Sequence, residues 1–535
     1  MTSPQRRWQI SLQRFISPEF LERWTLLALG VLAVAGVYLI LHLTAVAPWS
    51  YSDGTAYLAV ARNIAAGRGL VLQDPNGGFS FYTWHPPLYP LALSLPIALG
   101  MEALQAVRGL NAALFGLTVF LAGYSTFRFS RSFWLAGAAA GLILTSLEAL
   151  KAYAGLMSEG MFLFWILLGM LMLAVGLQNA QHPKRWLIGA GLAAGLAVLT
   201  RYTGLAWLAA GSVAVFLLMR GSLREKFRCT GSFFLPGALL SAAWGIPVFI
   251  ATRTLGSRSI GAGGGLMDSL RTYFQEFVQV IASWLPWSER VNQVLPAGLW
   301  LIGMVILLGG LVWLAHRRLL RKSEPTNPHG ILGWLVVLTS FIIGYILLHL
   351  GSYLSIAARP DVNGRLLLPL YPAGVLLAAA VVAYFSRVFR RRWLGGVMFA
   401  LLAILSVWSF QGELRDYLYE MNHYGQGYSS LRWLGKPIFA EISRLDAVQP
   451  LYANDAALVL FHTGRFPLEL DLNADRTAYE LALPAGTAGV LLANAGAAPG
   501  REVYENTLQA ARQQYQVLYE DEQGVIFVAK QPPDG

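Results

Sequence analysis

The sequence predicts a polytopic α-helical membrane protein, and its composition and the spacing of its apolar runs carry that prediction. Hydrophobic residues make up 56% of the 535 positions, charged residues make up 13%, and the mean hydropathy is +0.50. A soluble chain of this size carries about 25% charged residues. Apolar runs of about 20 residues, the length that crosses the hydrocarbon core, recur throughout residues 1–410. We therefore expect a bundle of membrane-spanning helices.

The basic residues point to membrane topology rather than to a nucleic-acid partner. The chain has 40 Lys and Arg against 29 Asp and Glu, a net charge of +11. Half of the basic residues gather in six short segments: Arg6, Arg7, Arg14 and Arg23; Arg128 and Arg131; Lys184 and Arg185; Arg220, Arg224, Lys226 and Arg228; Arg317, Arg318, Arg321 and Lys322; Arg387, Arg390, Arg391 and Arg392. The positive-inside rule places all six on the cytoplasmic side. We expect a plasma (inner) membrane protein with a cytoplasmic N-terminus and no nucleic-acid partner.

Eleven spans satisfy this orientation and place the C-terminal residues outside. They are expected at 24–46, 102–127, 133–150, 158–177, 186–202, 203–220, 230–252, 297–315, 331–350, 365–386 and 393–410. The apolar run 86–100 is short and rich in proline, so we expect a re-entrant or interfacial segment there. The run 186–220 would be about 50 Å long as one helix. We expect it to break at Thr200–Gly204 into a tight hairpin of two short helices.

The first apolar run is expected to be a retained helix rather than a cleaved signal peptide. Ala45-Val46-Ala47 resembles a small-residue cleavage site, but the run is longer than a signal core and Pro48 would follow the cut. Cys229, the only cysteine, falls in an expected cytoplasmic loop. The external regions are therefore expected to hold no disulfide and no cysteine metal site.

Three regions are expected on the external side: 47–101, 253–296 and 411–535. The first two would be loops of a membrane domain formed by residues 1–410. In the second region, apolar positions recur at helical spacing and predict a helix along the membrane interface; they are Leu270, Phe274, Phe277, Val278, Ile281 and Leu285. The glycines before it, Gly261 and Gly263 to Gly265, are typical of a flexible linker, with a gate over a site as the alternative.

The tail, residues 411–535, is expected to form a small external α/β domain. Short buried strands are predicted at 451–453 and 489–493, an amphipathic helix at 504–515, and a hairpin over 517–530 that turns at Gln523-Gly524. Asp455 and His462 lie near each other in sequence. A structural role is the preferred interpretation for this pair, and the tail shows no catalytic pattern.

Four clusters of charged and aromatic residues are expected at the external interface of the membrane. They are Asp53, Tyr57, Arg62 and His85; Lys151, Ser158 and Glu159; Arg201 and Tyr202; and Arg359, Asp361 and Arg365. Helix capping and snorkelling explain any one of them. Because ionisable groups near hydrocarbon are costly, four clusters at one depth favour a functional site.

These groups suit a lipid that carries phosphate. An arginine guanidinium binds phosphate oxygens through a planar fork and does not lose its proton. We expect desolvation to raise the pKa of a carboxylate near hydrocarbon toward the range in which it takes a proton from a hydroxyl. Two carboxylates could then serve as general base and as acid or metal partner.

Several short motifs share one order and one side of the membrane. In the first external loop they are Asp53-Gly-Thr-Ala-Tyr57, Ala61-Arg62-Asn63, Gly67-Arg-Gly69 and Pro86-Pro87-Leu88-Tyr89. Later motifs are Ser158-Glu159-Gly160, Leu199-Thr200-Arg201 and the run Gly364-Arg365-Leu366-Leu367-Leu368-Pro369-Leu370-Tyr371-Pro372. Together they resemble the GT-C glycosyltransferases, most closely the branch with protein O-mannosyltransferases and lipid A aminoarabinose transferases. The resemblance covers about residues 1–410.

The resemblance implies transfer of a sugar from a polyprenyl-phosphate donor to an acceptor hydroxyl on the external face. The acceptor could be a protein, a lipid or a glycan. The implied residues are, for catalysis, Asp53 and Glu159; for the donor phosphate, Arg201, Arg365, His85 and Arg62; and for substrate positioning, Tyr57 and Tyr202. The tail resembles accessory external domains of some relatives and could position the acceptor.

One departure from the family pattern concerns His85. Relatives often carry an acidic residue, or an acidic residue with Lys, just before the Pro-Pro step, where this chain has Trp84-His85. Two interpretations stay open: His85 takes a phosphate or metal role, or it is a structural histidine packed by Trp84. A divalent metal ion held by Asp53, Glu159 and His85 is accordingly an open expectation.

Two other functional classes compete with the enzyme. A transporter or lipid flippase would place its ionisable groups at the midplane and would show an inverted repeat, which the sequence lacks. A non-catalytic assembly protein would use the membrane section as an anchor. Eleven spans exceed what anchoring needs, and that interpretation leaves the external charges unexplained.

Overall fold

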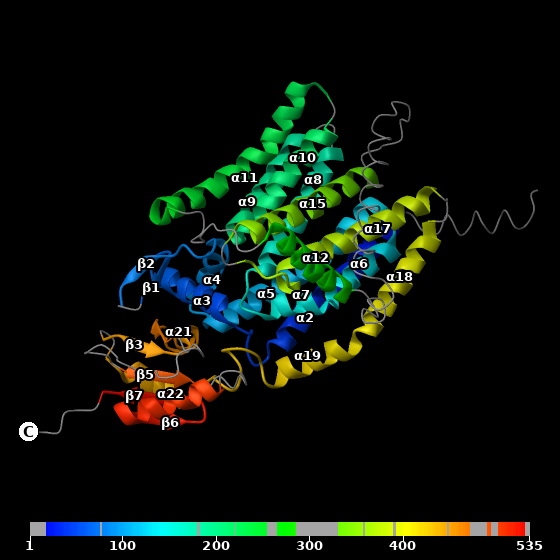
Figure 1. Cartoon of the computed structure of the whole chain (residues 1–535). Helices are drawn as coiled ribbons and strands as arrows, with labels where there is room; N and C mark the ends of the chain where they lie inside the picture. The colour runs from blue at the N-terminus through cyan, green and yellow to red at the C-terminus, as the bar shows by residue number, and fades with distance from the viewer. Residues whose placement is uncertain are drawn as a thin grey trace, which may run out of the picture.

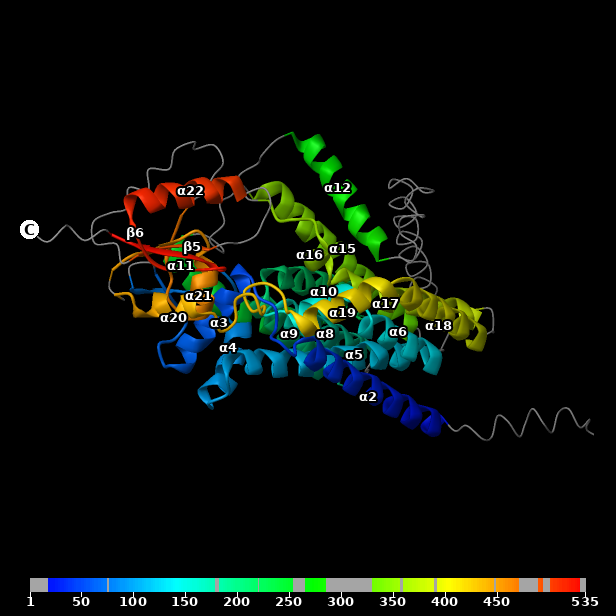
Figure 2. The same cartoon turned by 90° about the horizontal axis from the view of Figure 1, so that it is seen from below.

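A computed structural model describes residues 18–74, 77–178, 182–219, 221–253, 265–284, 330–356, 359–388, 392–446, 449–470, 489–493 and 501–529, and the structural statements below concern these residues. Long helices pack side by side into a bundle, and the C-terminal strands lie at one end of it, beside the first external loop (Figure 1). The view from below shows α12 on the outside of the bundle (Figure 2).

The bundle is built from helices that follow the expected apolar runs. Their bounds are α2 Pro18–Leu43, α5 Ala103–Ser130, α6 Phe133–Leu144, α7 Leu147–Ala154, α8 Glu159–Gln178, α9 Pro183–Thr200, α10 Leu205–Leu218, α11 Leu223–Thr252, α15 Ile331–Ser355, α17 Leu370–Val388, α18 Arg392–Ser409 and α19 Gln411–His423. One continuous hydrophobic core joins most of these helices.

Among the described helices, six are long and apolar enough to cross a membrane. Two bent pairs, α6 with α7 and α18 with α19, raise this number to eight if each pair is one span. The chain is therefore a multi-pass membrane protein. The expected span 297–315 lies outside the described residues, and α9 and α10 are not among the six. The count of eleven spans thus stays a prediction.

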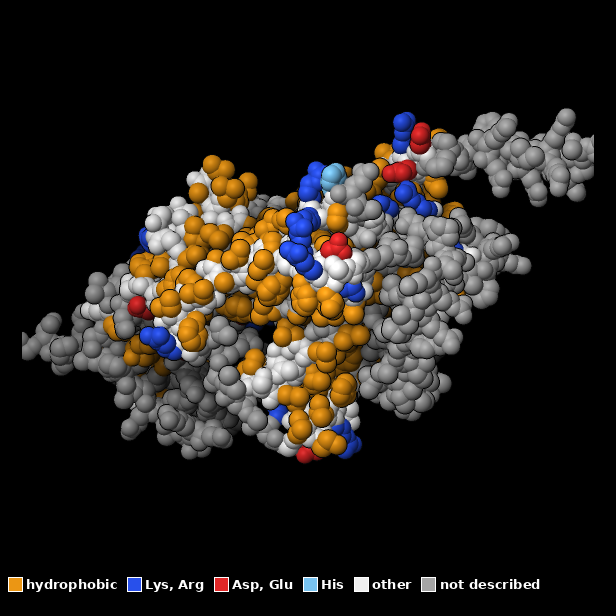
Figure 3. All heavy atoms as spheres, turned by 90° about the horizontal axis from the view of Figure 1, so that it is seen from above, with side chains coloured by type: hydrophobic (Ala, Val, Ile, Leu, Met, Phe, Trp, Pro, Cys, Tyr) orange, Lys and Arg blue, Asp and Glu red, His pale blue; other side chains and the backbone are white. Residues whose placement is uncertain are grey.

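The surface of the bundle fits a lipid environment. Hydrophobic side chains cover much of the face in Figure 3. On α11 the exposed large apolar side chains are Leu223, Phe227, Phe234, Leu235, Leu239, Ile246, Phe249 and Ile250. Soluble monomers rarely expose apolar surface this extensively.

Two expected interruptions of the helices are confirmed. The run 186–220 breaks where predicted, because α9 ends at Thr200 and α10 begins at Leu205, with the 3-10 turn η1, Tyr202–Gly204, between them. The proline-rich run after Trp84 forms α4, Leu88–Ala98, which is only 11 residues long. At a rise of 1.5 Å per residue, such a helix is too short to span a bilayer.

The first external loop holds more regular structure than the sequence analysis foresaw. It contains helix α3, Ser52–Ala65, and an antiparallel pair of strands, β1 Val71–Gln73 and β2 Phe79–Phe81. Backbone hydrogen bonds join Trp49 to Ala154 and Leu156, and the Tyr428 N–H donates to the Ser50 carbonyl at 2.9 Å. These bonds fix the start of α3 between the α7–α8 connection and the tail.

The tail contains a five-stranded mixed sheet in the order β4-β3-β5-β7-β6. The bounds are β3 Leu451–Ala453, β4 Leu468–Glu469, β5 Gly489–Ala493, β6 Gln516–Asp521 and β7 Gly524–Val528. One face of the sheet packs with α20, Pro437–Arg444, and α21, Ala456–Thr463, and the other with α22, Arg501–Gln514. The predicted strands at 451–453 and 489–493, and the hairpin turning at Gln523-Gly524, are confirmed. The division of the chain at residue 410 stays a prediction.

The predicted amphipathic helix in the second external region is also confirmed. Helix α12 runs over Leu266–Ser283, and its buried side includes Tyr273, Phe277 and Val278. The segment 254–264, which holds most of the expected linker or gate, lies outside the described residues, as does Leu285.

Candidate functional site

Asp53 lies in the first turn of α3, where free backbone N–H groups favour a carboxylate. Its Oδ2 accepts a hydrogen bond from Arg365 Nη2 at 2.5 Å, and its Oδ1 lies 3.6 Å from His85 Nε2. The next residue is glycine because a Cβ at Gly54 would lie 2.6 Å from the Leu156 carbonyl oxygen. This close approach brings Asp53 beside the start of α8.

Glu159 is the first residue of α8, and its side chain is 3% exposed. Its Oε1 forms an ion pair with Arg201 Nη1 at 2.7 Å and accepts a hydrogen bond from Arg365 Nε at 2.5 Å. A carboxylate so deeply buried is tolerated when it is paired and hydrogen-bonded. The two arginines therefore make the buried position of Glu159 tenable.

Arg365 joins the two carboxylates. It lies in the short helix α16, Gly364–Leu367, whose N-terminus is capped by the Asn363 side chain at 3.0 Å from the Leu366 N–H. The Tyr345 hydroxyl donates to the Leu366 carbonyl at 2.7 Å and fixes the same turn. We call Asp53, Glu159, Arg201 and Arg365 the carboxylate–arginine cluster.

His85 lies beside this cluster and contacts the carboxylate of Asp53. Its Nδ1 is 2.8 Å from the Tyr82 hydroxyl, and its ring packs against Tyr57 with centroids 5.0 Å apart. Trp84 instead packs against Phe466 of the tail. The aromatic rings that pack against His85 are those of Tyr57 and Tyr82, and its role, phosphate or metal binding or structural, stays open.

Tyr57 and Tyr202 lie around the cluster. Tyr57 is 1% exposed, and its hydroxyl is 3.1 Å from Ser158 Oγ, which accepts from Arg201 Nη1 at 3.3 Å. Tyr202 follows Arg201 in η1, and its hydroxyl accepts from Trp244 Nε1 at 3.2 Å. Tyr57 is thus linked to Arg201 through Ser158, and the substrate-positioning role of Tyr57 and Tyr202 stays a prediction.

Other charged residues from the four expected clusters lie elsewhere. Arg62 donates to the Phe461 carbonyl at 3.4 Å and faces the tail, so the geometry separates it from the donor-phosphate role implied by the resemblance. Lys151 pairs with Glu148 at 3.2 Å, and Arg359 donates to Ser269 Oγ at 2.9 Å. Helix capping and snorkelling alone thus do not explain the positions of Asp53 and Glu159, because their carboxylates bind arginines.

The electrostatic environment of Asp53 differs from the expectation. Burial acts to raise the pKa of this carboxyl, but His85, Arg365 and Arg201 outweigh it and hold the pKa below its usual value. The expectation that desolvation raises the pKa of this carboxylate is therefore wrong for the unliganded cluster. The reason is that positive groups converge on the same carboxylate.

Comparisons with solved structures show which fold carries this cluster. The oligosaccharyltransferase of Archaeoglobus fulgidus in complex with Zn and sulfate is 13% identical, with 93% of this chain and 73% of that chain covered and a TM-score of 0.52. The archaeal oligosaccharyltransferase AglB from Archaeoglobus fulgidus, in complex with an inhibitory peptide and a dolichol-phosphate, is 14% identical over 96% of this chain and 75% of that chain, with a TM-score of 0.51.

The chain has a GT-C fold. The family model for dolichyl-phosphate-mannose-protein mannosyltransferases also matches residues 84–250, a stretch that includes His85, Glu159 and Arg201. ArnT from Cupriavidus metallidurans bound to undecaprenyl phosphate is a further similar structure, 14% identical over 93% of this chain and 97% of that chain, with a TM-score of 0.47. No curated protein matches the chain in sequence. The resemblance drawn from the motifs is confirmed for the fold.

A divalent metal ion held by Asp53, Glu159 and His85 stays a prediction. Among the described residues, no three His, Cys, Asp or Glu side chains converge as metal ligands. The guanidinium of Arg365 binds both Asp53 and Glu159. The buried Oε2 of Glu159, however, has no hydrogen-bond partner among the described residues. The arrangement therefore neither requires nor excludes an ion.

Sequence reasoning missed two tyrosines that shape the site. Tyr82 holds His85, and Tyr345 holds the turn that carries Arg365. Tyr82 lies only three residues before His85, so the sequence already indicated that the two side chains could lie close together. Tyr345 lies inside the apolar run of α15, where nothing in the sequence marks its hydroxyl as a partner of residue 366.

Proposed function

We propose that this protein is a membrane glycosyltransferase that moves a sugar from a polyprenyl-phosphate donor to an acceptor hydroxyl on the external face of the plasma membrane. The observation that carries the proposal is the fork of Arg365, which joins Asp53 to Glu159 across three distant segments of the chain. The GT-C fold, the family match over 84–250 and the dolichol-phosphate bound to the archaeal neighbour support a lipid-phosphate donor.

The two arginines would hold the donor phosphate. Arg365 is 40% exposed on its side chain, whereas Arg201 is 16% exposed, so Arg365 is the cation that an arriving ligand meets first. Guanidinium groups bind phosphate oxygens through two parallel N–H bonds. Positive charge held in place before reaction stabilises the charge that develops on the departing phosphate.

Asp53 would act as the general base. It takes the proton from the acceptor hydroxyl while that oxygen attacks the anomeric carbon, and the bond between that carbon and the phosphate oxygen breaks. Polyprenyl phosphate leaves with the electron pair. Attack from the side opposite the phosphate inverts the anomeric centre.

Donor binding would also adjust the base. Arg365 binds Asp53 and lowers the pKa of its carboxyl. If the donor phosphate draws this guanidinium away, Asp53 loses a positive neighbour and becomes a stronger base. His85 would keep Asp53 oriented, since it contacts the other carboxylate oxygen. The base thus gains strength when the donor is present.

Glu159 would serve as an anchor rather than as a second base. Its side chain is nearly inaccessible, and both arginines bind its Oε1. We propose that Arg201 and Arg365, held in place by this carboxylate, supply the positive charge without a divalent ion.

The proposal also includes the membrane topology: a cytoplasmic N-terminus, eleven spans and an external tail. The acceptor of the sugar is a protein, a lipid or a glycan. The transporter alternative is not favoured by the GT-C fold.

Sugar transfer in membranes tests this proposal. Membranes that contain the wild-type chain would be assayed with a panel of polyprenyl-phosphate sugars, and the preferred donor would then be used with Asp53→Asn. Loss of a general base should lower the rate about 10²- to 10⁴-fold. Asp416→Asn on α19 is the matched control, since that side chain is exposed and far from the cluster in the sequence. A wild-type rate for Asp53→Asn would exclude Asp53 as the base.

A further inference from the structure

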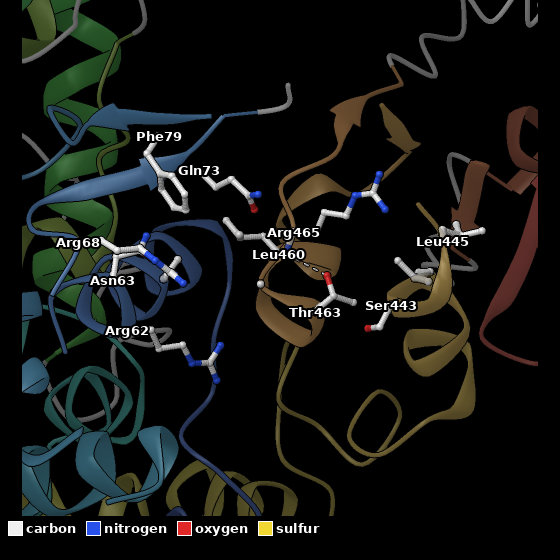
Figure 4. A pocket seen from close by; sticks show the side chains of 13 residues that line it. Arg62, Asn63, Arg68, Gln73, Phe79, Ser443, Leu445, Leu460, Thr463 and Arg465 are labelled. Carbon is white, nitrogen blue, oxygen red and sulfur yellow. Dashed lines mark hydrogen bonds between the residues drawn. The ribbon is translucent and has the colours of Figure 1, made fainter. Parts of the chain in front are cut away.

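A cavity lies between the segment 47–101 and the tail. Its volume is about 430 Å³, within the range of small-molecule sites. The residues that line it are Ala59, Arg62, Asn63, Arg68, Gln73, Phe79, Ile442, Ser443, Leu445, Leu460, Thr463, Gly464 and Arg465. They come from α3, β1 and β2 on one side and from α20, α21 and their connections on the other (Figure 4).

The cavity carries positive charge, since three arginines and no Asp or Glu are among its lining residues. Glu102 acts by charge on Arg62 and Asp446 on Arg465, but neither acid lines the cavity. In the part of the chain that the structure describes, no carboxylate forms a salt bridge with Arg62 or Arg68. Arg62 is half-buried, and desolvation makes an unpaired charge costly at such a position. An anionic ligand would pair with Arg62 and with the exposed Arg68.

The local backbone holds Arg68 at this cavity. The N–H of Gly67 donates to the Ile64 carbonyl and that of Arg68 to the Asn63 carbonyl, each at 2.9 Å, which closes α3 with a Schellman motif. Gly67 has a φ of 76°, which favours glycine. The Arg68 Nη1 then donates to Asn63 Oδ1 at 3.1 Å, and its guanidinium lies over the Phe79 ring. These contacts order an arginine on an otherwise exposed turn.

The two guanidinium groups keep hydrogen-bonding capacity for a ligand. An arginine carries five N–H donors. Arg62 makes one hydrogen bond, to the Phe461 carbonyl, and Arg68 makes one, to Asn63, within the described residues. Figure 4 shows the side chains of Arg62, from α3, and Arg68, from the turn after α3, on the side of the cavity opposite α21, while the Arg465 guanidinium turns away from them. Arg465 bonds instead to the Gln449 carbonyl.

The walls of the cavity pack against each other as a formed interface. Ala56 and Val60 of α3, Leu72 of β1 and Leu460 of α21 form one buried apolar cluster beside it. The cavity therefore lies next to packed contacts between the loop and the tail. Asp53 and Arg62 are nine residues apart on α3, which places them on opposite faces with a rise of about 13.5 Å between them. The cavity is thus separate from the carboxylate–arginine cluster.

We propose that this Arg62–Arg68 cavity is a second ligand site, which binds a small molecule or a substrate group that carries phosphate or carboxylate. The ligand's anionic group would accept hydrogen bonds from both guanidinium groups, and the rest of the ligand would lie between Phe79 and the α20–α21 side. This site needs neither Asp53 nor the transfer reaction. Its test is therefore independent of the test of the proposed function.

Calorimetric titration of the purified full-length chain in detergent tests the site directly. The probes are inorganic phosphate, glucose 6-phosphate and uncharged glucose. We expect glucose 6-phosphate to bind more tightly than inorganic phosphate because it fills more of the cavity, and glucose not to bind. Losing charge-assisted hydrogen bonds should weaken glucose 6-phosphate binding about tenfold or more in Arg62→Gln and Arg68→Gln.

Arg415→Gln is the matched control, because it removes the same charge from an exposed position on α19. Arg68→Gln is the decisive variant, since the Arg68 side chain is exposed and its loss leaves the fold intact. Asp53→Asn should bind the probes as the wild type does. Equal binding by Arg68→Gln and Arg415→Gln, equal binding of glucose and glucose 6-phosphate, or no binding of either anion would overturn the proposal.

Discussion

The two ends of helix α3 present arginines in opposite electrostatic situations. At its N-terminal end, Arg365 and Arg201 are bound to Asp53 and Glu159, so positive and negative charges balance within the cluster. At its C-terminal end, Arg62 and Arg68 have only uncharged hydrogen-bond acceptors among the described residues. The first end resembles a preorganised reaction site whose charges hold one another, whereas the second resembles a site that needs an anion.

The largest effect should follow the loss of the buried carboxylate. Glu159→Gln removes the partner of two arginines inside the protein, and breaking such a pair costs about 3–5 kcal/mol of unfolding free energy. Thermal unfolding in detergent measures this loss. The control is Glu441→Gln, whose exposed pair with Arg444 on α20 should contribute at most about 1 kcal/mol. Equal shifts for the two variants would contradict the anchoring role of Glu159.

A smaller effect is expected when the shape of the cation changes but its charge does not. Arg365→Lys keeps the positive charge and loses the planar fork that reaches Asp53 and Glu159 together. The donor KM should rise about tenfold or more because a charge-assisted hydrogen bond to phosphate is lost, while the acceptor KM should change little. Arg359→Lys, from the same segment but bonded to Ser269, should leave both KM values unchanged.

Membrane topology made much of the cluster predictable from sequence. Asp53, Glu159, Arg201 and Arg365 all lie at ends of apolar segments, and the positive-inside rule places those ends on one side. Because these helix ends lie at one depth in the membrane, their side chains can meet in only a few arrangements. The sequence therefore indicated which residues could meet, although the pairing of Arg365 with both carboxylates depends on distant packing.

The misplacement of Arg62 has a simple geometric cause. The sequence analysis treated residues 47–101 as a loop, in which Asp53 and Arg62 could share a site. Once residues 52–65 form a helix, a separation of nine residues turns Arg62 to the opposite face. The wrong expectation for Asp53 has a different cause, since desolvation can be guessed from a membrane boundary but the neighbouring cations come from distant segments.

The smallest expected effect is the pH dependence of stability, and it separates the two ends of α3. The folded-state pKa of Asp53 is lowered, so its contribution is present above the unfolded value of about 3.9 and is lost as the pH falls through the folded value. The stability difference between wild type and Asp53→Asn should shrink between about pH 5 and pH 3, where Asp53 itself takes up a proton. Above pH 5 the charge of neighbouring His85 also changes the difference, because a protonated His85 stabilises the Asp53 carboxylate.

Because the Asp53 side chain is 34% exposed, solvent screening should limit this difference to about 1 kcal/mol. The difference between wild type and Arg68→Gln should instead stay constant over the same range, since Arg68 is bound to the uncharged amide of Asn63. Thermal unfolding of the three proteins between pH 7 and pH 3 measures both. If acidification from pH 5 to pH 3 increased the wild-type advantage over Asp53→Asn, burial would outweigh the positive neighbours, and Arg365 could not be the group that restrains the base.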